Sequence, residues 1–418
     1  MKKYVFITMN IGGINGAEQY IYNKMNYLKQ KGYQVFIFSG RPEKILIDGF
    51  REYENLVNPA LRFYPSCLSA RECQKTVDWM VSVMDVQAAD TCIIESSNVT
   101  SSLWGELIAS KVQAQHLVVI MQENHNYNAA MRNFLKFKLQ RHELSGIFDN
   151  SVSAMLKEPD LEFRPDMRVR AYCNNVVQDC KDHYSAQLDE TADYTFGSIG
   201  RLEKEYVPAL MDVLCTYFTE NPGKKFNLLL IGGCADKRRL NQIKEKIAQC
   251  GNVNLVLTGN LYPIPRQLVK HVDLFVSAAG SSAVSYYEMV PTVKINQATA
   301  MPLGIIGYDF ELGENSNNQP LEGRSIIDCI NMVMNDALAI DYVEDFEVSY
   351  YKRMHTEFDR QLQFGEGQNI GYYDDVLKVR YTDTVYKMCS VVCRIFGVKI
   401  TYLILECIRK LVRGTSNA

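Results

Sequence analysis

The sequence predicts an α/β protein with two doubly wound domains facing a cleft, followed by a C-terminal helical extension. Short apolar runs alternate with amphipathic stretches along most of the 418 residues. This alternation begins again after a polar stretch at 178–194, and several of the apolar runs end in glycine turns. Regular alternation of strand and helix is typical of parallel sheets that helices cover on both faces. We therefore expect domains at 1–178 and 194–363, with helices at 364–418.

Composition and charge narrow the class of protein. The hydrophobic content of 47% is ordinary for a globular protein, and the net charge of −3 argues against a dedicated nucleic-acid binder. The 12 cysteines are scattered without metal-ligand spacing, so we expect buried, reduced thiols in a cytoplasmic protein and no metal site. The N-terminus fits a first β-strand better than a signal peptide. No run of about 18 uncharged apolar residues occurs, which predicts no transmembrane helix.

Strands and helices alternate in the first half. An apolar strand at 3–9 leads into a glycine-rich turn and an amphipathic helix that ends at Lys31 and Gly32, and a second strand follows at 34–40. This order is a βαβ unit. Further strands are expected at 91–96, 116–122 and 146–151, with helices around 70–84, 100–111 and 129–141.

The second half repeats this pattern. Strands and their turns are expected at 194–202, 226–233, 253–259, 273–280 and 291–296, with helices at 207–222, 236–251 and 266–272. Asn221, Pro222 and Gly251 supply end signals for two of these helices. Helices are also expected within 320–363 and 374–412, on either side of a glycine-rich break at 364–372.

The turn after the first strand is a candidate ligand-binding element. Gly12, Gly13 and Gly16 permit a tight turn, and the helix that follows offers the positive end of its dipole. Such glycine turns are often only structural, so both interpretations stay open. The stretch is not the G-x-G-x-x-G dinucleotide fingerprint and no acidic residue ends the second strand, which argues against a dehydrogenase.

A second candidate element follows the first strand of the second half. Gly200 ends that strand, and Arg201 and Lys204 come directly after it. Two cations at this place can neutralise a pyrophosphate and stabilise the negative charge that develops on a departing nucleoside diphosphate. The alternative is a surface salt-bridge cluster of the same cations with Glu203 and Glu205.

The stretch 273–291 contains a third candidate element. Its apolar strand ends in a turn of small residues that includes Gly280, Ser281 and Ser282, so a bulky ligand can approach the backbone closely. We expect the next helix to point unpaired N–H groups at a phosphate. Glu288 within that helix could accept hydrogen bonds from ribose hydroxyls, and the alternative is an ordinary helix glutamate.

Two further glycine turns end strands of the second half. Gly233 lies in the turn at 231–233, and Gly259 lies in the turn at 257–260. Ligands bind at such strand ends in open α/β sheets, so both glycines are expected to contact the same ligand.

Polar residues after strands of the first half are candidates for contact with a second substrate. His125 could orient an acceptor or act as a base, although a lone histidine is more often structural. Glu123 beside it is a weaker candidate. Glu95 and Asn98, which follow an earlier strand, are also weak candidates for facing the acceptor.

The C-terminus is basic and amphipathic. From residue 379 onward the sequence contains two carboxylates, Asp383 and Glu406, and seven cations: Arg380, Lys387, Arg394, Lys399, Arg409, Lys410 and Arg413. Six apolar residues fall on one helical face: Ile400, Leu403, Ile404, Cys407, Ile408 and Leu411. Such a helix either lies on an anionic membrane surface or packs its apolar face on the protein.

In their order and spacing, these motifs resemble those of family-four retaining glycosyltransferases of the bacterial surface-polysaccharide type, which have the GT-B fold. The resemblance covers roughly residues 3–310. It rests on GGINGAE (12–18), YCNNVV (172–177), SIGRLEKE (198–205), LLLIGG (228–233), NVNLVLTGN (252–260) and DLFVSAAGSSAVSYYE (273–288).

The resemblance implies two Rossmann-like domains, with a nucleotide-activated sugar held mainly by the second and the acceptor mainly by the first. It also implies a final helix that crosses back to the first domain. Arg201 and Lys204 would contact the donor diphosphate, Glu288 the ribose, and the turn containing Gly13 and Gly16 the phosphates or the sugar. No metal or cofactor is expected, because cations and helix ends take over the electrostatic role of a metal ion.

One position departs from the family pattern. The family usually has two glutamates eight positions apart, and here Glu288 matches the second while Gly280 occupies the first. The first glutamate usually contacts the transferred sugar. Backbone N–H groups of the 279–282 turn could substitute for it, the chain could belong to a branch with a serine-rich turn, or catalysis could be impaired.

The leading hypothesis is a metal-independent, retaining glycosyltransferase that moves a sugar from a nucleoside-diphosphate sugar to a glycan or lipid-linked saccharide. We expect it in the cytoplasm, peripheral on the inner face of an anionic membrane, with no nucleic-acid partner. The alternatives are a nucleotide-sugar epimerase on the same fold and a non-catalytic nucleotide-sugar-binding partner of another transferase.

Overall fold

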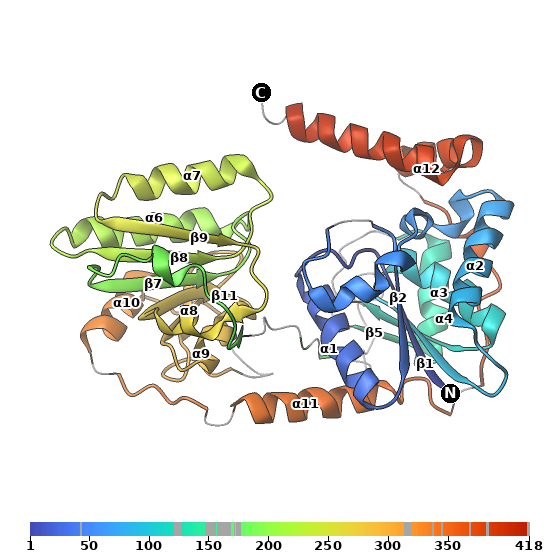
Figure 1. The fold of residues 1–418 in the computed structure, drawn as a ribbon, viewed down its shortest axis with the longest axis horizontal. Helices are drawn as coiled ribbons and strands as arrows, with labels where there is room; N and C mark the ends of the chain where they lie inside the picture. Colours follow the sequence, from blue (N-terminus) through green and yellow to red (C-terminus); the bar gives the residue numbers. More distant parts are fainter. Residues whose placement is uncertain are drawn as a thin grey trace. The chain divides into compact units, whose positions relative to one another are not determined.

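The computed structural model describes all of the chain except residues 42–43, 121–126, 147–155, 157–168, 171, 173–176, 313–318, 337, 344–345, 368, 382–383 and 416–418 (Figure 1). The chain forms two compact units: Met1–Cys173 together with Tyr351–Ala418, and Asn174–Tyr350. The polar stretch at 178–194 therefore belongs to the second unit. The chain leaves that unit within a helix rather than after residue 363, and the C-terminal segment is part of the first unit.

The first unit is built on a five-stranded parallel sheet in the order β2-β1-β3-β4-β5. Its strands are β1 Lys2–Thr8, β2 Gln34–Ser39, β3 Thr91–Ser96, β4 Gln115–Ile120 and β5 Leu144–Gly146. Its helices include α1 Gly16–Gln30, α2 Ala70–Met84, α3 Val99–Val112 and α4 Ala129–Gln140. Almost every strand residue is buried, as in a parallel sheet covered on both faces.

The stretch between β2 and α2 was not anticipated from the sequence. It forms three short 3₁₀ helices, η1 Asp48–Leu56, η2 Pro59–Arg62 and η3 Pro65–Cys67. Two of them begin at a proline, whose fixed φ favours the first position of a helix. Most aromatic and aliphatic side chains of this stretch are buried, so it forms part of the core rather than a surface loop.

The second unit contains a six-stranded sheet in the order β13-β12-β11-β7-β8-β9. Its strands are β7 Tyr194–Ile199, β8 Phe226–Ile231, β9 Val253–Gly259, β11 Leu274–Ala278, β12 Thr292–Ile295 and β13 Pro302–Ile305. β13, a strand that was not expected from the sequence, pairs with β12 in the antiparallel sense at this edge. A separate parallel pair joins β6 Val177–Gln178 to β10 Ile264–Pro265.

Helices cover both faces of the second sheet. Alternate residues of β8 point to opposite faces, as the strand period of two requires. Leu228 and Leu230 pack with α6 Tyr206–Glu220, α7 Lys237–Ala248 and α10 Ile326–Asn335. Leu229 and Ile231 pack with α8 Arg266–Lys270 and α9 Ser281–Tyr287. This division confirms the doubly wound arrangement expected for the second half.

The helix α11 Phe346–Gln361 carries the chain from the second unit to the first, where a buried charge network holds its end. Nζ of Lys24 lies 2.5 Å from Oε2 of Glu95 and donates to Oε1 of Gln361 at 2.8 Å. The hydroxyl of Tyr4 also donates to Oε2 of Glu95, at 2.5 Å. Burial lowers the pKa of Lys24, while Glu95 opposes this shift. Removing one partner of such a pair leaves an uncompensated buried charge.

A second buried network joins β3, α3, β4 and α4 (residues of the first unit) to the C-terminal segment. Nδ1 of His116 lies 2.6 Å from Oε2 of Glu106, and Nε2 of His116 lies 3.0 Å from Oγ of Ser96. Nζ of Lys138 lies 2.7 Å from the same oxygen of Glu106. The backbone N–H of Tyr373 donates to the other carboxylate oxygen, Oε1, at 2.8 Å.

The environment of this second network changes the pKa of both titratable partners at its centre. Burial and then the charge of Lys138 lower the pKa of His116, while Glu106 opposes the shift. Burial raises the pKa of Glu106, but His116 and Lys138 outweigh it and lower that pKa to about 2. The folded state therefore favours a neutral His116 and an ionised Glu106.

The described chain ends with η6 Val376–Lys378 and α12 Thr384–Thr415. Within α12, Gly397 has φ 79° and ψ 168°, so the helix is kinked there. By length and composition alone, Lys387–Leu405 is long and apolar enough to cross a membrane. The expectation that no segment qualifies was therefore too strict: it required an uncharged run, and Arg394 and Lys399 interrupt this one.

We predict that the first unit loses stability as the pH falls below about 6.5, the ordinary pKa of histidine. The unfolded chain protonates His116 first and Glu106 from its ordinary pKa of 4.5 downward, whereas the folded chain resists both events. Urea unfolding between neutral pH and about pH 5 measures the slope. His116→Gln should flatten it, and His271→Gln, at an exposed histidine, should not. If His116→Gln keeps the wild-type slope of unfolding free energy against pH, the loss of stability does not come from His116.

We also predict that Gly105→Ala lowers the free energy of unfolding by about 1–3 kcal/mol, because a methyl group there overpacks the core. A Cβ on Gly105 would overlap Nε2 of His116 and Oγ of Ser96. Ser110→Ala, at an exposed position of the same helix, is the matched control. Urea unfolding at neutral pH measures both variants, and equal effects would show that His116 does not require the glycine.

Candidate functional site

The strongest candidate site lies at the carboxyl edge of the second sheet. β11, β7, β8 and β9 are neighbours in that order and run parallel, so their carboxyl ends meet along one edge. A glycine lies at the end of each of these four strands or within two residues of it. Ligands of open α/β sheets bind at such an edge.

The turns after β7 and β8 approach each other closely. Gly200 and Gly232 have φ values of 153° and 157°, and a Cβ on Gly232 would overlap the carbonyl oxygen of Gly200. The N–H of Gly200 donates to the carbonyl of Ile231, and the N–H of Leu202 donates to the carbonyl of Gly233, both at 2.9 Å. We call these two hydrogen-bonded turns the paired glycine turns. Only bare backbone fits at their contact.

The turn after β9 completes this part of the edge. A Cβ on Gly233 would overlap the side-chain amide of Asn260, so the second glycine turn also approaches the third. Gly259 has φ 65° and open space around its Cβ position. A glycine at position 259 therefore permits the positive φ of the turn and is not required by close packing.

Arg201 and Lys204 follow the paired glycine turns, as expected. Arg201 is exposed, and its Nη1 lies 3.7 Å from Oε1 of Glu203. Partial burial and the charge of Arg201 lower the pKa of Lys204, while Glu203 opposes this shift. The ion pair that formed the alternative interpretation is thus present, but one carboxylate faces two cations. Because Glu203 can neutralise only one of the two cations, net positive charge remains here for an anionic ligand.

Tyr206 is a further residue of this site that sequence reasoning missed. A Cβ on Gly200 would lie 2.9 Å from the Tyr206 hydroxyl oxygen, so the phenol adjoins the first glycine turn. Burial raises the pKa of Tyr206 to about 12, with Arg201 opposing the shift. The hydroxyl therefore stays protonated at neutral pH and can act as a hydrogen-bond donor. The sequence signal that could have identified Tyr206 is its position five residues after Arg201, at the start of a helix.

The 279–282 turn after β11 differs in detail from the expectation. Ala279 has φ 54°, an uncommon conformation for a residue with a Cβ, whereas Gly280 has an ordinary right-handed backbone. Oγ of Ser281 and Oγ of Ser282 each donate to the carbonyl three residues earlier, at 2.7 Å. Ser282 is fully buried and Ser281 is partly exposed. A donor could therefore contact Ser282 only through its backbone, whereas the Ser281 hydroxyl is partly accessible.

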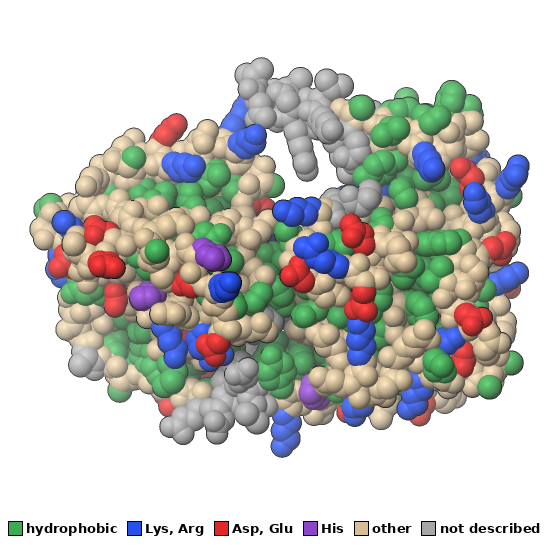
Figure 2. Space-filling view, in the orientation of Figure 1, with side chains coloured by type: hydrophobic (Ala, Val, Ile, Leu, Met, Phe, Trp, Pro, Cys, Tyr) green, Lys and Arg blue, Asp and Glu red, His purple; other side chains and the backbone are tan. Residues whose placement is uncertain are grey.

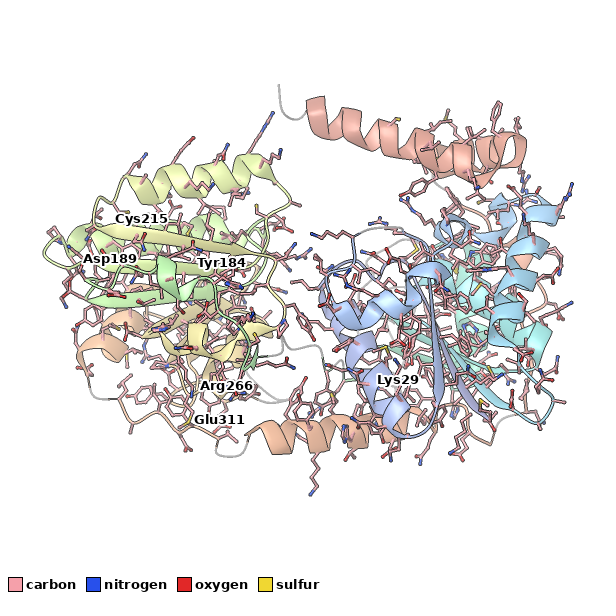
Figure 3. The ribbon with its side chains drawn as sticks, viewed as in Figure 1. Lys29, Tyr184, Asp189, Cys215, Arg266 and Glu311 are labelled. Atoms are coloured by element: carbon pink, nitrogen blue, oxygen red, sulfur yellow. The ribbon has the colours of Figure 1, made fainter. Side chains whose placement is uncertain are left out.

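Glu288 is held by an arginine that the sequence analysis did not single out. It follows the last residue of α9 rather than lying within the helix. Its Oε2 lies 3.3 Å from Nη1 of Arg266, the first residue of α8, which Figure 3 labels. Nε of Arg266 lies 3.5 Å from Asp179. The Glu288 side chain is only 10% exposed.

The candidate site residues of the first unit make mainly structural contacts. Gly16 is the first residue of α1, and a Cβ on Gly13 would lie 2.7 Å from the Asn15 amide nitrogen. Oδ1 of Asn98 accepts from the N–H of Ser101 at 2.9 Å and caps α3. Glu95 is 1% exposed in its contact with Lys24, so the expectation that it faces an acceptor is corrected. His125 and Glu123 lie outside the described residues.

Two other constellations do not form an accessible site. Ser96, His116 and Glu106 have the hydrogen-bond order of a hydrolytic triad, but all three are buried and no substrate can reach the hydroxyl. Among the described residues, no group of three His, Cys, Asp or Glu side chains could hold a metal ion.

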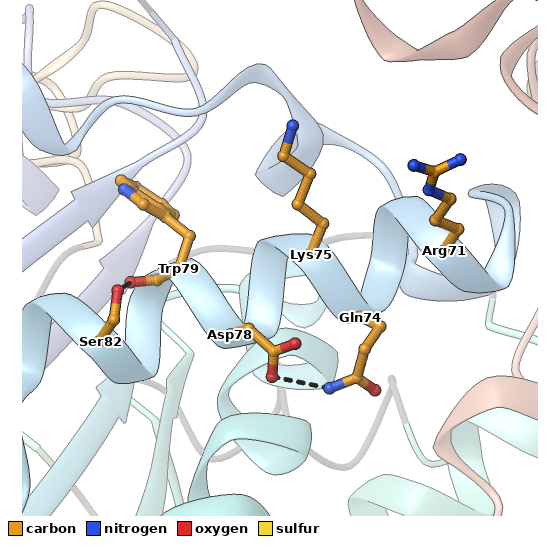
Figure 4. Close-up of a pocket in the computed structure, with 6 residues that line it drawn as sticks. All are labelled: Arg71, Gln74, Lys75, Asp78, Trp79 and Ser82. Carbon is orange, nitrogen blue, oxygen red and sulfur yellow. Dashed lines mark hydrogen bonds between the residues drawn. The ribbon is translucent and has the colours of Figure 1, made fainter.

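A hollow of about 640 Å³ lies on the surface of α2 in the first unit (Figure 4). Its lining comes from this single helix: Arg71, Gln74, Lys75, Asp78, Trp79 and Ser82. The Gln74 amide donates to Asp78 at 2.8 Å. Because one helix face forms the whole lining, polar groups do not converge on a ligand from several elements, as they do in most binding sites.

Comparison with known proteins supports the fold. No protein-family model matches the chain, and no curated protein sequence matches it. A glycosyltransferase structure from Rickettsia africae aligns with a TM-score of 0.57 at 13% identity, covering 87% of this chain and 98% of that one. HepE of Anabaena, in complex with UDP and glucose, aligns with a TM-score of 0.54 at 13% identity, covering 86% and 97%. The expectation of a GT-B-type α/β fold is confirmed.

We predict that Gly232→Ala lowers the free energy of unfolding of the second unit by about 2–4 kcal/mol. The new Cβ would overlap the backbone of Gly200 and would also strain a φ of 157°. Gly223→Ala, in the same unit and with open space around its Cβ position, is the matched control. If urea unfolding shows wild-type stability for Gly232→Ala, the paired glycine turns do not constrain the structure as described.

Proposed function

We propose that this chain is a glycosyltransferase that moves a sugar from a nucleoside-diphosphate sugar to a glycan or lipid-linked saccharide, with retention of configuration. The observation that carries the proposal is the pair of glycine turns followed by Arg201 and Lys204 at the carboxyl edge of the second sheet. The likeness in fold to HepE, whose structure holds UDP and glucose, supports this class of donor.

The diphosphate of the donor would lie against the paired glycine turns. Backbone without side chains lets phosphate oxygens come close to peptide N–H groups, and Arg201 and Lys204 supply positive charge beside them. Partial burial lowers the pKa of Lys204, and a bound diphosphate would favour its charged form again. These two cations would take the electrostatic role that a metal ion plays in other sugar transferases.

The same groups would stabilise the transition state. When the bond between the sugar C1 and the diphosphate oxygen breaks, both electrons remain on that oxygen and negative charge grows there. Preorganised cations next to it lower the barrier because they need no rearrangement during the step. The acceptor hydroxyl attacks C1 from the side that the diphosphate leaves and gives its proton to the departing oxygen. The configuration at C1 is then retained, and no protein nucleophile is needed.

The remaining parts of the donor have candidate partners at the same edge. Glu288 would accept hydrogen bonds from ribose hydroxyls, with Arg266 fixing its orientation. The sugar would meet the 279–282 turn, where Gly280 offers no side chain. Sugar recognition would then depend on the backbone of this turn and on the partly exposed hydroxyl of Ser281.

We predict that Arg201→Ala and Lys204→Ala each weaken UDP binding about 10- to 100-fold, because each removes a charge-assisted contact. Titration calorimetry measures the dissociation constants. Lys244→Ala is the matched control, since Lys244 is an exposed cation in the middle of α7. If both variants bind UDP with the wild-type affinity, the diphosphate does not contact Arg201 and Lys204.

Product analysis separates the proposed activity from its alternatives. The chain is incubated with a UDP-sugar alone and with added saccharide acceptors, and the sugars are identified by mass spectrometry and NMR. A transferase forms an elongated acceptor with the anomeric configuration of the donor. An altered free sugar without acceptor indicates an epimerase, and UDP binding without any product indicates a non-catalytic binding protein. Either of these two results would overturn the proposed transfer.

A further inference from the structure

The outer face of α12 is apolar and the first unit does not cover it. Seven large side chains on this helix are between 41% and 66% exposed: Met388, Val391, Ile395, Phe396, Ile400, Leu403 and Ile404. Figure 2 shows hydrophobic side chains gathered over this part of the first unit. A contiguous apolar surface of this kind on a protein marks a place where another molecule or a membrane is bound.

The inner face of α12 is fixed to the first unit. Cys389, Cys393, Val398 and Thr401 are buried there. Nη2 of Arg394 donates to the carbonyl of Ser66 at 2.6 Å, and the Arg62 guanidinium lies 4.6 Å from the ring centre of Tyr402. The apolar outer face is therefore held outward by contacts on the opposite side of the same helix.

The charge of this region is positive. Residues 384–405 include Lys387, Arg394 and Lys399 and no carboxylate. The N–H of Val398, next to the kink, donates to Glu72 of α2 at 3.4 Å. Arg71 and Lys75 are close neighbours of Glu72 on that helix, and Figure 4 shows their side chains extending from the same side of it. An apolar face rimmed by cations complements an anionic lipid surface.

The kink in α12 favours a helix that lies on a bilayer over one that crosses it. Lys387–Leu405 has a mean hydropathy of 1.8 over 19 residues, which by length and composition is enough to cross. However, the helix breaks at Gly397, and the part from Thr384 to Phe396 would extend only about 20 Å at 1.5 Å per residue. The hydrocarbon core of a bilayer is about 30 Å thick. The part after the kink continues into Glu406, Arg409 and Lys410.

We infer that α12 docks the protein on an anionic lipid bilayer, with the helix lying in the plane of the membrane surface. Its outer apolar side chains enter the boundary between head groups and acyl chains, while the exposed Lys387 and Lys399 contact lipid phosphates. The inner face stays packed on the first unit. This inference concerns a surface of the first unit and does not depend on the proposed sugar transfer.

Flotation of the full chain with lipid vesicles tests the inference. We expect the wild type to float with vesicles of phosphatidylcholine and phosphatidylglycerol, and to float less with phosphatidylcholine alone or at high salt. The double variant Ile395→Glu, Leu403→Glu should lower the partition coefficient at least about 100-fold, because two charges would enter the apolar boundary. Ile370→Glu, at another exposed apolar position of the first unit, should bind as the wild type does.

Three outcomes would overturn the inference. Undiminished vesicle binding by the double variant would place the membrane contact elsewhere. Resistance of the bound wild type to alkaline carbonate extraction would show a spanning helix rather than a surface one. A dimer in light scattering that the double variant dissociates, with no vesicle binding by either, would show that a second copy covers this face. Thermal unfolding of each variant verifies that the fold is intact.

Discussion

The close approach of the Gly200 and Gly232 turns is the constraint on which the candidate site depends. A side chain on Gly232 would overlap the backbone of Gly200, so the ends of β7 and β8 meet only as bare peptide. Arg201 and Lys204 follow this contact directly, which combines accessible backbone with positive charge. Both features suit a diphosphate. Cores on both faces of the sheet hold the two strands in register and therefore hold the turns together.

Buried charges play the corresponding role in the first unit. Lys24 and Glu95 hold the end of α11, and Glu106 holds the backbone of Tyr373, so residues far apart in the sequence are joined at two points. Such networks stabilise a fold only when every partner is present. The second network also anchors the segment that leads to α12, through the backbone of Tyr373. The C-terminal segment is thus part of the first unit and not an appendage.

Much of the fold could be predicted because apolar runs and glycine turns are local signals. The strands that end at Ile199, Ile231 and Gly259 were located within a few residues, together with the turns that follow them. The antiparallel β13 was missed although its partner β12 comes just before it, because a strand of four residues that begins with a proline has a weak local signal. Burial of Glu95 was missed because its partner Lys24 lies on another element, distant in the sequence. The contact between Glu288 and Arg266 likewise depends on folding and has no spacing pattern.

The account rests centrally on the diphosphate of a nucleotide donor lying at the paired glycine turns. A crystal structure of the chain with UDP tests this most directly. The account predicts diphosphate oxygens within hydrogen-bonding distance of the Arg201 and Lys204 side chains and of the backbone at the end of β7. A nucleotide bound elsewhere on the chain, with these two side chains free of it, would contradict the account.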